Sequence, residues 1–80
     1  MAEINVDKKL DCSGMLCPMP VVKTKKALKD MEIGHVLEMI STDAGAMPDM
    51  YAWAKQTGHE LLDAKEDEGK IFTFLVKKTH

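Results

Sequence analysis

Two prolines at close spacing, Pro18 and Pro20, constrain the fold of this chain more than any other feature of its sequence. Proline lacks a backbone N–H and clashes with the preceding turn, so this pair does not fit a central strand or a helix interior. It does fit the first turn of a helix, where the N–H groups have no intrahelical partner. Because Pro18 biases Cys17 away from the helical conformation, Cys17 is predicted at the N-cap. The helix is predicted to run from about Pro18 to Met31, with Gly34 just past its end as a stop signal.

A cysteine at the start of a helix has chemical consequences. The positive end of the helix dipole favours a thiolate, and we expect the N–H of Met19 to remain free near the sulfur. Lys23, Lys25 and Lys26 add positive charge within a turn or two. A free cysteine is often a small buried hydrophobe, but the prolines and the helix start favour a presented sulfur. Cys17 is therefore predicted to be a reactive nucleophile.

The rest of the chain predicts one α/β domain over residues 1–80, in which residues 1–7 are a frayed leader. Alternating apolar residues and turn signals predict strands at Lys8–Cys12, Val36–Ser41, Glu60–Lys65 and Ile71–Lys77, with a hairpin turn at 66–69. A second helix is predicted at Ala46–Thr57, capped by Thr42 or Asp43 and stopped by Gly58. The order β-α-β-α-β-β indicates a two-layer sandwich with two helices on one face of a four-stranded mixed sheet.

Each predicted helix has a face for the core. On the first helix this face holds Val21, Thr24, Ala27, Leu28 and Met31, and on the second it holds Met47, Met50, Tyr51, Trp53, Ala54 and Thr57. The other side of the first helix is covered by lysines, and Val22 lies among them near the thiol. We therefore expect Val22, Lys23, Lys25 and Lys26 to form a basic face that docks a protein partner. Solvated surface is the common alternative for such a charge run.

Charge and composition exclude several function classes. The net charge is −2 and all eleven basic residues are lysines, so direct nucleic-acid binding is not expected. No apolar run approaches the roughly 20 residues of a membrane span, and the first residues contain no secretory apolar segment. We therefore expect a cytoplasmic protein without membrane contact, whose cysteines serve reactive or metal-binding chemistry rather than a disulfide scaffold.

The second cysteine, Cys12, lies on the apolar side of the first predicted strand, which favours a place in the core. Because it is only five positions from Cys17, it is also a candidate second thiol that could act as a resolving partner. Together with Met15 and Met19 the two cysteines form a sulfur-rich cluster that could suit Cu(I). The spacing is not that of a zinc pair and no histidine is nearby, so no metal site is expected.

At Leu10–Pro20 the sequence resembles the TusA/SirA-like family, whose hallmark is a Cys-Pro-x-Pro box after a Leu-Asp-x-x-Gly-Leu-type lead-in. The matching positions are Leu10-Asp11, Gly14, Met15-Leu16 and the box Cys17-Pro18-Met19-Pro20. Further matches are Leu28, Gly34, Thr42-Asp43, Asp49-Met50, Trp53 and Gly58-His59, so the resemblance covers nearly the whole chain. Two departures are Met15, where leucine is usual, and proline at Pro48 rather than near Ala44 or Gly45.

The resemblance implies a two-layer sandwich and a sulfur-carrier protein. Cys17, in the box with Pro18, Met19 and Pro20, would accept sulfane sulfur as a transient persulfide from a cysteine desulfurase or a rhodanese-like donor. It would then pass this sulfur to a cysteine of an acceptor such as a DsrE-like protein, without a bound cofactor. The alternatives are a regulatory or accessory module of sulfur, selenium or redox metabolism that uses the Cys17 thiol, and a Cu(I)-binding protein.

Overall fold

The computed structural model describes residues 5–16, 19–67 and 69–80 of the chain. Its elements follow in the order β1 (Lys8–Cys12), α1 (Met19–Lys29), β2 (Val36–Ser41), α2 (Ala46–Thr57), β3 (Glu60–Asp67) and β4 (Ile71–Lys77). Among the described residues, no helix is long and apolar enough to cross a membrane. The order of elements predicted from the sequence is confirmed.

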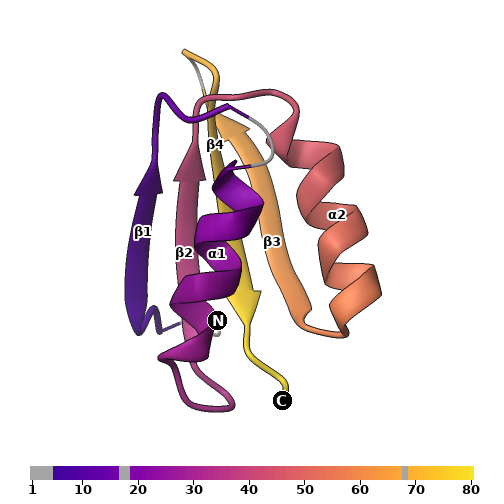
Figure 1. Cartoon of the computed structure of the whole chain (residues 1–80). Coiled ribbons are helices and arrows are strands. Elements are labelled where there is room, and N and C mark those ends of the chain that lie inside the picture. The colour runs from indigo at the N-terminus through magenta and orange to yellow at the C-terminus, as the bar shows by residue number, and fades with distance from the viewer. Residues whose placement is uncertain (1–4, 17–18, 68) are drawn as a thin grey trace.

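The four strands form one mixed sheet in the order β1-β2-β4-β3. β1 runs parallel to β2, and β4 runs antiparallel to both β2 and β3. Figure 1 shows α1 and α2 side by side on one face of this sheet, which confirms the predicted two-layer arrangement. Because β1 and β2 are parallel, their carboxyl ends meet at the same edge, and both strand-to-helix loops lie there (Figure 1).

The core lies between the sheet and the two helices. From the sheet it takes the alternate residues Cys12, Leu37, Met39, Phe72, Phe74 and Val76, and from the helices Ala27, Leu28, Ala46, Met50, Trp53 and Ala54. Thr24 is also fully buried, and its hydroxyl donates to the carbonyl of Pro20 at 2.8 Å. The predicted core face of α1 is confirmed, whereas Tyr51 of α2 is 55% exposed and its predicted place in the core is wrong.

Several predicted boundaries move by a turn or less. α1 ends at Lys29 rather than Met31, because the N–H groups of Asp30 and Met31 already bond three residues back, to Ala27 and Leu28. Gly34 does not stop this helix; it forms the turn before β2, with φ +95°, and its N–H donates to the carbonyl of Lys78 at 2.7 Å.

The hairpin between β3 and β4 is also tighter than predicted. β3 continues past Lys65, since Glu66 pairs with Phe72 and Asp67 with Ile71. Gly69 and Lys70 both have positive φ and reverse the chain within this short turn. At the end of α2, Gly58 adopts φ +83° and donates its N–H to Ala54, so the predicted stop at this glycine is confirmed.

Candidate functional site

The segment that leads to Cys17 leaves the sheet at the carboxyl end of β1. The N–H of Ser13 donates to the Asp11 carboxylate at 2.9 Å, and hydrogen bonds from Ser13 lower the pKa of that carboxyl group. The N–H of Met15 donates to the carbonyl of Cys12 at 3.1 Å, and Gly14 between them takes φ +80°. Residues other than glycine rarely adopt this backbone conformation, so the tight turn depends on Gly14.

A hydrogen bond ties this loop to the neighbouring strand-to-helix loop. The N–H of Gly14 donates to the Thr42 hydroxyl at 2.8 Å, across 28 residues of sequence. The predicted cap of α2 is therefore wrong for Thr42, whose hydroxyl serves the other loop. The N-cap is Gly45, without a side-chain cap bond, and its N–H donates to the Asp43 carboxylate at 3.1 Å. The two loops at this edge of the sheet thus position each other.

The predicted reactive residues, Cys17 and Pro18, lie outside the described residues, and the site is built from the segments on either side. The N–H of Met19 donates to the carbonyl of Leu16 at 2.9 Å. The expectation that this N–H remains free near the sulfur is therefore wrong. The reason is local, because a carbonyl three residues back is a suitable partner for an N–H in the first turn of a helix. Pro20 is fully buried at the start of α1.

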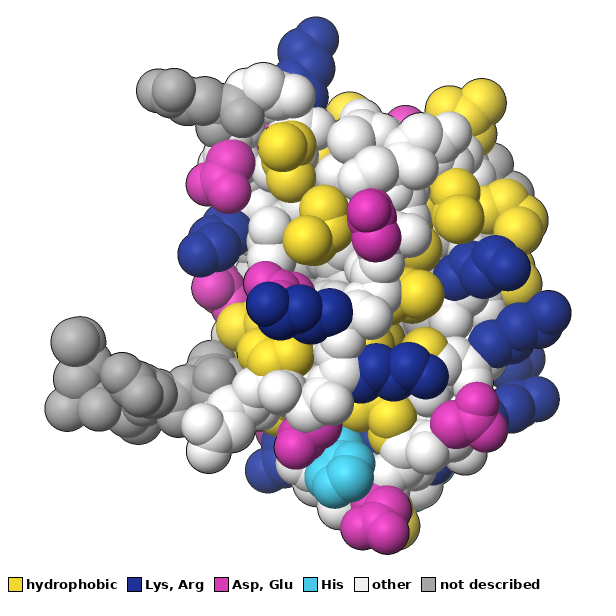
Figure 2. All heavy atoms as spheres, turned by 90° about the vertical axis from the view of Figure 1, so that its left-hand side faces the viewer, with side chains coloured by type: hydrophobic (Ala, Val, Ile, Leu, Met, Phe, Trp, Pro, Cys, Tyr) yellow, Lys and Arg dark blue, Asp and Glu magenta, His cyan; other side chains and the backbone are white. Residues whose placement is uncertain are grey.

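Exposed apolar side chains surround the same end of α1. Leu16 is 73% exposed, Met19 42% and Val22 38%. Figure 2, which looks onto the β1 edge, shows hydrophobic side chains gathered at the upper right, on the side that carries α1. Val22 is exposed as predicted. The exposure of Leu16 was not predicted, because Leu16 lies in a loop, where helical periodicity does not apply. We call Leu16, Met19 and Val22 the apolar rim.

Lysines follow the apolar rim along α1. Lys25 and Lys26 are exposed and Lys23 is half-buried. In Figure 2 lysine side chains lie below the hydrophobic group on the same side of the molecule. The charge of Lys23 lowers the pKa of the Cys12 thiol, whereas burial and the charge of Asp11 raise it. The structure therefore brings Val22 and the three predicted docking lysines onto one helix, directly after the candidate site.

Cys12 is a free cysteine in the core, as the alternation of its strand predicts, and it is fully buried. Burial raises the pKa of its thiol, and the charge of Asp11 raises it further, while Lys23 partly opposes this. A buried thiol of raised pKa is a poor nucleophile. Its partner in the Cu(I) hypothesis, Met15, packs against the core. In the described part of the chain, no three His, Cys, Asp or Glu side chains come together as a metal site would need.

A family model described as "Sulfurtransferase TusA" matches residues 8–78, which include all six elements of the fold. The chain belongs to the TusA family. Among curated relatives, the sulfur carrier protein TusA of Allochromatium vinosum is 51% identical over 91% of this chain and 95% of its own length. The putative sulfur carrier protein YrkI of Bacillus subtilis is 50% identical over 90% of this chain and 95% of its own length.

The fold has also been seen in a solved structure. A SirA-like protein from Desulfitobacterium hafniense superposes with a TM-score of 0.79, covering 91% of this chain and 99% of its own. The two sequences are 22% identical, so this likeness concerns the fold. The family resemblance that the sequence indicated is confirmed.

Proposed function

We propose that this protein is a sulfur carrier that accepts sulfane sulfur as a persulfide on Cys17 and passes it to a cysteine of a partner protein. Membership of the TusA family carries the proposal, because relatives that align over 95% of their own length are named as sulfur carriers. Cys17 is the cysteine for this role, since Cys12 is fully buried with a raised thiol pKa.

The transfer is an exchange between thiolates and persulfides. The Cys17 thiolate attacks the terminal sulfur of a donor persulfide; the new bond joins Cys17 to that sulfur, and the donor cysteine leaves as a thiolate. In the second half, an acceptor thiolate attacks the terminal sulfur now on Cys17, which leaves as a thiolate in turn. No external oxidant or reductant is needed, because one sulfur–sulfur bond forms as another breaks. No cofactor takes part.

The described residues that flank Cys17 in the sequence suit a carrier that docks two partners in turn. The apolar rim provides contact area that can be buried on binding. Lys23, Lys25 and Lys26 add positive charge beside it, which speeds encounter with acidic surfaces and fixes their orientation. A donor such as a cysteine desulfurase or a rhodanese-like protein, and a DsrE-like acceptor, would bind here by small interfaces that exchange readily.

Intact-mass spectrometry tests the proposal directly. The protein is incubated with a cysteine desulfurase and cysteine, and separately with a rhodanese and thiosulfate, without reductant. We expect one added sulfur atom in the wild type and in Cys12→Ser, and none in Cys17→Ser. If folded protein with reduced thiols gains no sulfur from either donor, the carrier proposal is wrong, and a regulatory or accessory role for Cys17 replaces it.

A further inference from the structure

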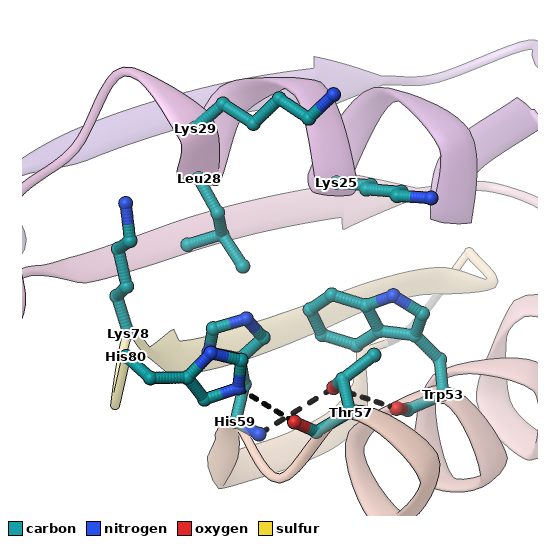
Figure 3. A pocket seen from close by; sticks show the side chains of 8 residues that line it. All are labelled: Lys25, Leu28, Lys29, Trp53, Thr57, His59, Lys78 and His80. Carbon is teal, nitrogen blue, oxygen red and sulfur yellow. Dashed lines mark hydrogen bonds between the residues drawn. The ribbon is translucent and has the colours of Figure 1, made fainter.

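A cavity of about 300 Å³ lies between α1 and α2, and on α1 its lining begins at Lys25, after the apolar rim. α1 lines it with Lys25, Leu28 and Lys29, and α2 contributes Trp53 (Figure 3). These α1 residues lie roughly 9 to 15 Å along the helix axis from Met19, at a rise of about 1.5 Å per residue. The lining of this cavity, called here the α1–α2 pocket, contains no residue of the apolar rim and shares only Lys25 with the predicted docking residues. The volume of the pocket is at the small end of the range for ligand pockets.

One wall of the α1–α2 pocket is a stack of flat rings. His59 stacks on Trp53, with ring centroids 5.5 Å apart, and on His80, with centroids 4.3 Å apart. Hydrogen bonds hold both imidazoles, since a His80 ring nitrogen lies 2.7 Å from the carbonyl oxygen of Thr57 and the N–H of Thr79 donates to His59 at 3.2 Å. Leu28 lies opposite, so Leu28 and the Trp53 ring give the pocket apolar surface beside the fixed imidazoles (Figure 3).

The rim of the α1–α2 pocket is positively charged. Its lining includes Lys25, Lys29 and Lys78, and no Asp or Glu among the described residues lines it. Lys78 is anchored, because its ammonium group donates to the carbonyl of Met31 at 2.7 Å. Lys25 and Lys29 form no ion pair with any residue that the structure describes. Three ammonium groups without a counter-charge attract an anion and repel a cation.

A buried donor without an acceptor adds an independent observation. Trp53 is 8% exposed, and its indole nitrogen is buried with no hydrogen-bond partner among the described residues. Figure 3 shows this nitrogen on the ring edge that faces α1, toward Lys25. Buried donors are nearly always paired in folded proteins, so an unpaired one beside a cavity marks a place for an acceptor atom. An oxygen that entered between Lys25 and the indole ring would accept this hydrogen bond.

We propose that the α1–α2 pocket binds a small organic anion in which a carboxylate is attached to a flat or apolar body. The body lies against Leu28 and the stacked rings, and the carboxylate lies near Lys25 and Lys29, where it accepts from the Trp53 indole. A simple inorganic anion would leave the apolar wall uncovered, and a neutral amide could accept the indole hydrogen bond through its carbonyl oxygen but would not neutralise the ammonium groups. Binding does not depend on Cys17.

The single tryptophan of the chain makes the test direct. In ¹⁵N-labelled protein the indole N–H gives one NMR signal, which is followed during titration with benzoate, with benzamide as the uncharged analogue and with sulfate as an anion lacking an apolar body. We expect benzoate to shift this signal and the pocket amides in a saturable way. Benzamide should bind about tenfold more weakly, the loss expected when one charge-assisted hydrogen bond becomes a neutral one. Sulfate keeps the charge but loses the apolar contact, and it should also bind about tenfold more weakly.

Variants separate the pocket from general surface charge. Lys25→Gln/Lys29→Gln should lower benzoate affinity about tenfold or more, whereas Lys26→Gln, on the same helix but outside the lining, should leave it unchanged. Cys17→Ser should bind benzoate like the wild type, which distinguishes this site from the sulfur-transfer site. Equal binding of benzoate and benzamide by the wild type would overturn the proposal even if the double variant fails to fold. An effect of Lys26→Gln as large as that of the double variant would also overturn it.

Discussion

Replacing Gly14 by alanine tests whether the turn before Cys17 depends on a glycine backbone. An ideal Cβ at Gly14 meets no atom of the described residues within 4 Å, so the cost of the substitution comes from the φ of +80°. A non-glycine residue in this conformation costs about 1–2 kcal/mol. Alanine also restricts the unfolded chain more than glycine does, which offsets about 0.5 kcal/mol of this cost. We therefore expect Gly14→Ala to lower the free energy of unfolding by about 1 kcal/mol.

Gly34 provides a matched control at the other end of the molecule. Its φ is +95°, and among the residues that the structure describes a Cβ there also meets nothing within 4 Å, so Gly34→Ala should lower the free energy of unfolding by a similar amount. With a urea dependence of about 1 kcal/mol per M, both unfolding midpoints should fall by about 1 M. The two variants should differ in function, because only Gly14 donates to Thr42 and positions the loop that leads to Cys17.

The assay combines urea unfolding with the initial rate of persulfide formation on Cys17, measured by intact mass in a Cys12→Ser background. Gly14→Ala should slow sulfur acceptance under conditions in which both variants are fully folded, whereas Gly34→Ala should leave the rate unchanged. A Gly14→Ala protein as stable as its parent would refute the backbone argument. Equal rates in the two variants would refute the link between this loop and the thiol.

Three further predictions concern the reactivity of the two cysteines, the pH dependence of stability and the packing of the core. In native protein near neutral pH, iodoacetamide should modify Cys17 and leave Cys12 unmodified, because burial raises the pKa of the Cys12 thiol and removes it from solvent; rapid double modification of folded protein would contradict this. Burial first, then the charges of His80 and Lys78, lower the pKa of His59, so its contribution to stability is present above its ordinary pKa and is lost as the pH falls below it. When the pH is lowered from about 7.5 to 5.5, the urea midpoint of the wild type should therefore fall more than that of His59→Gln. An equal fall in the two proteins would contradict this role of His59. Phe74 is fully buried in the middle of the sheet, so Phe74→Ala should lose about 3–5 kcal/mol of unfolding free energy by thermal or urea denaturation, and a loss under about 1 kcal/mol would show that the core is packed differently.

The sequence by itself determined the features that depend on local sterics and side-chain alternation. Pro18 and Pro20 fit the first turn of a helix and not its interior, and α1 begins at Met19, the first described residue after Cys17 and Pro18. Alternation placed Phe72, Phe74 and Val76 on the buried face of β4, and Gly58 ends α2 because its left-handed conformation requires no partner from elsewhere in the chain. The family was also readable from the Cys17-Pro18-Met19-Pro20 box and its lead-in.

Only the tertiary structure decided how distant residues meet. The strand order β1-β2-β4-β3 and the hydrogen bond from Gly14 to Thr42 join parts of the chain that no short-range rule connects. The Thr42 hydroxyl accepts this bond instead of capping α2 as predicted. The α1–α2 pocket likewise needs α1, α2 and the segment after β4 to pack together before His80 can stack on His59. Such contacts depend on the global packing that offsets the entropy of closing long loops, and this information is spread over the whole chain.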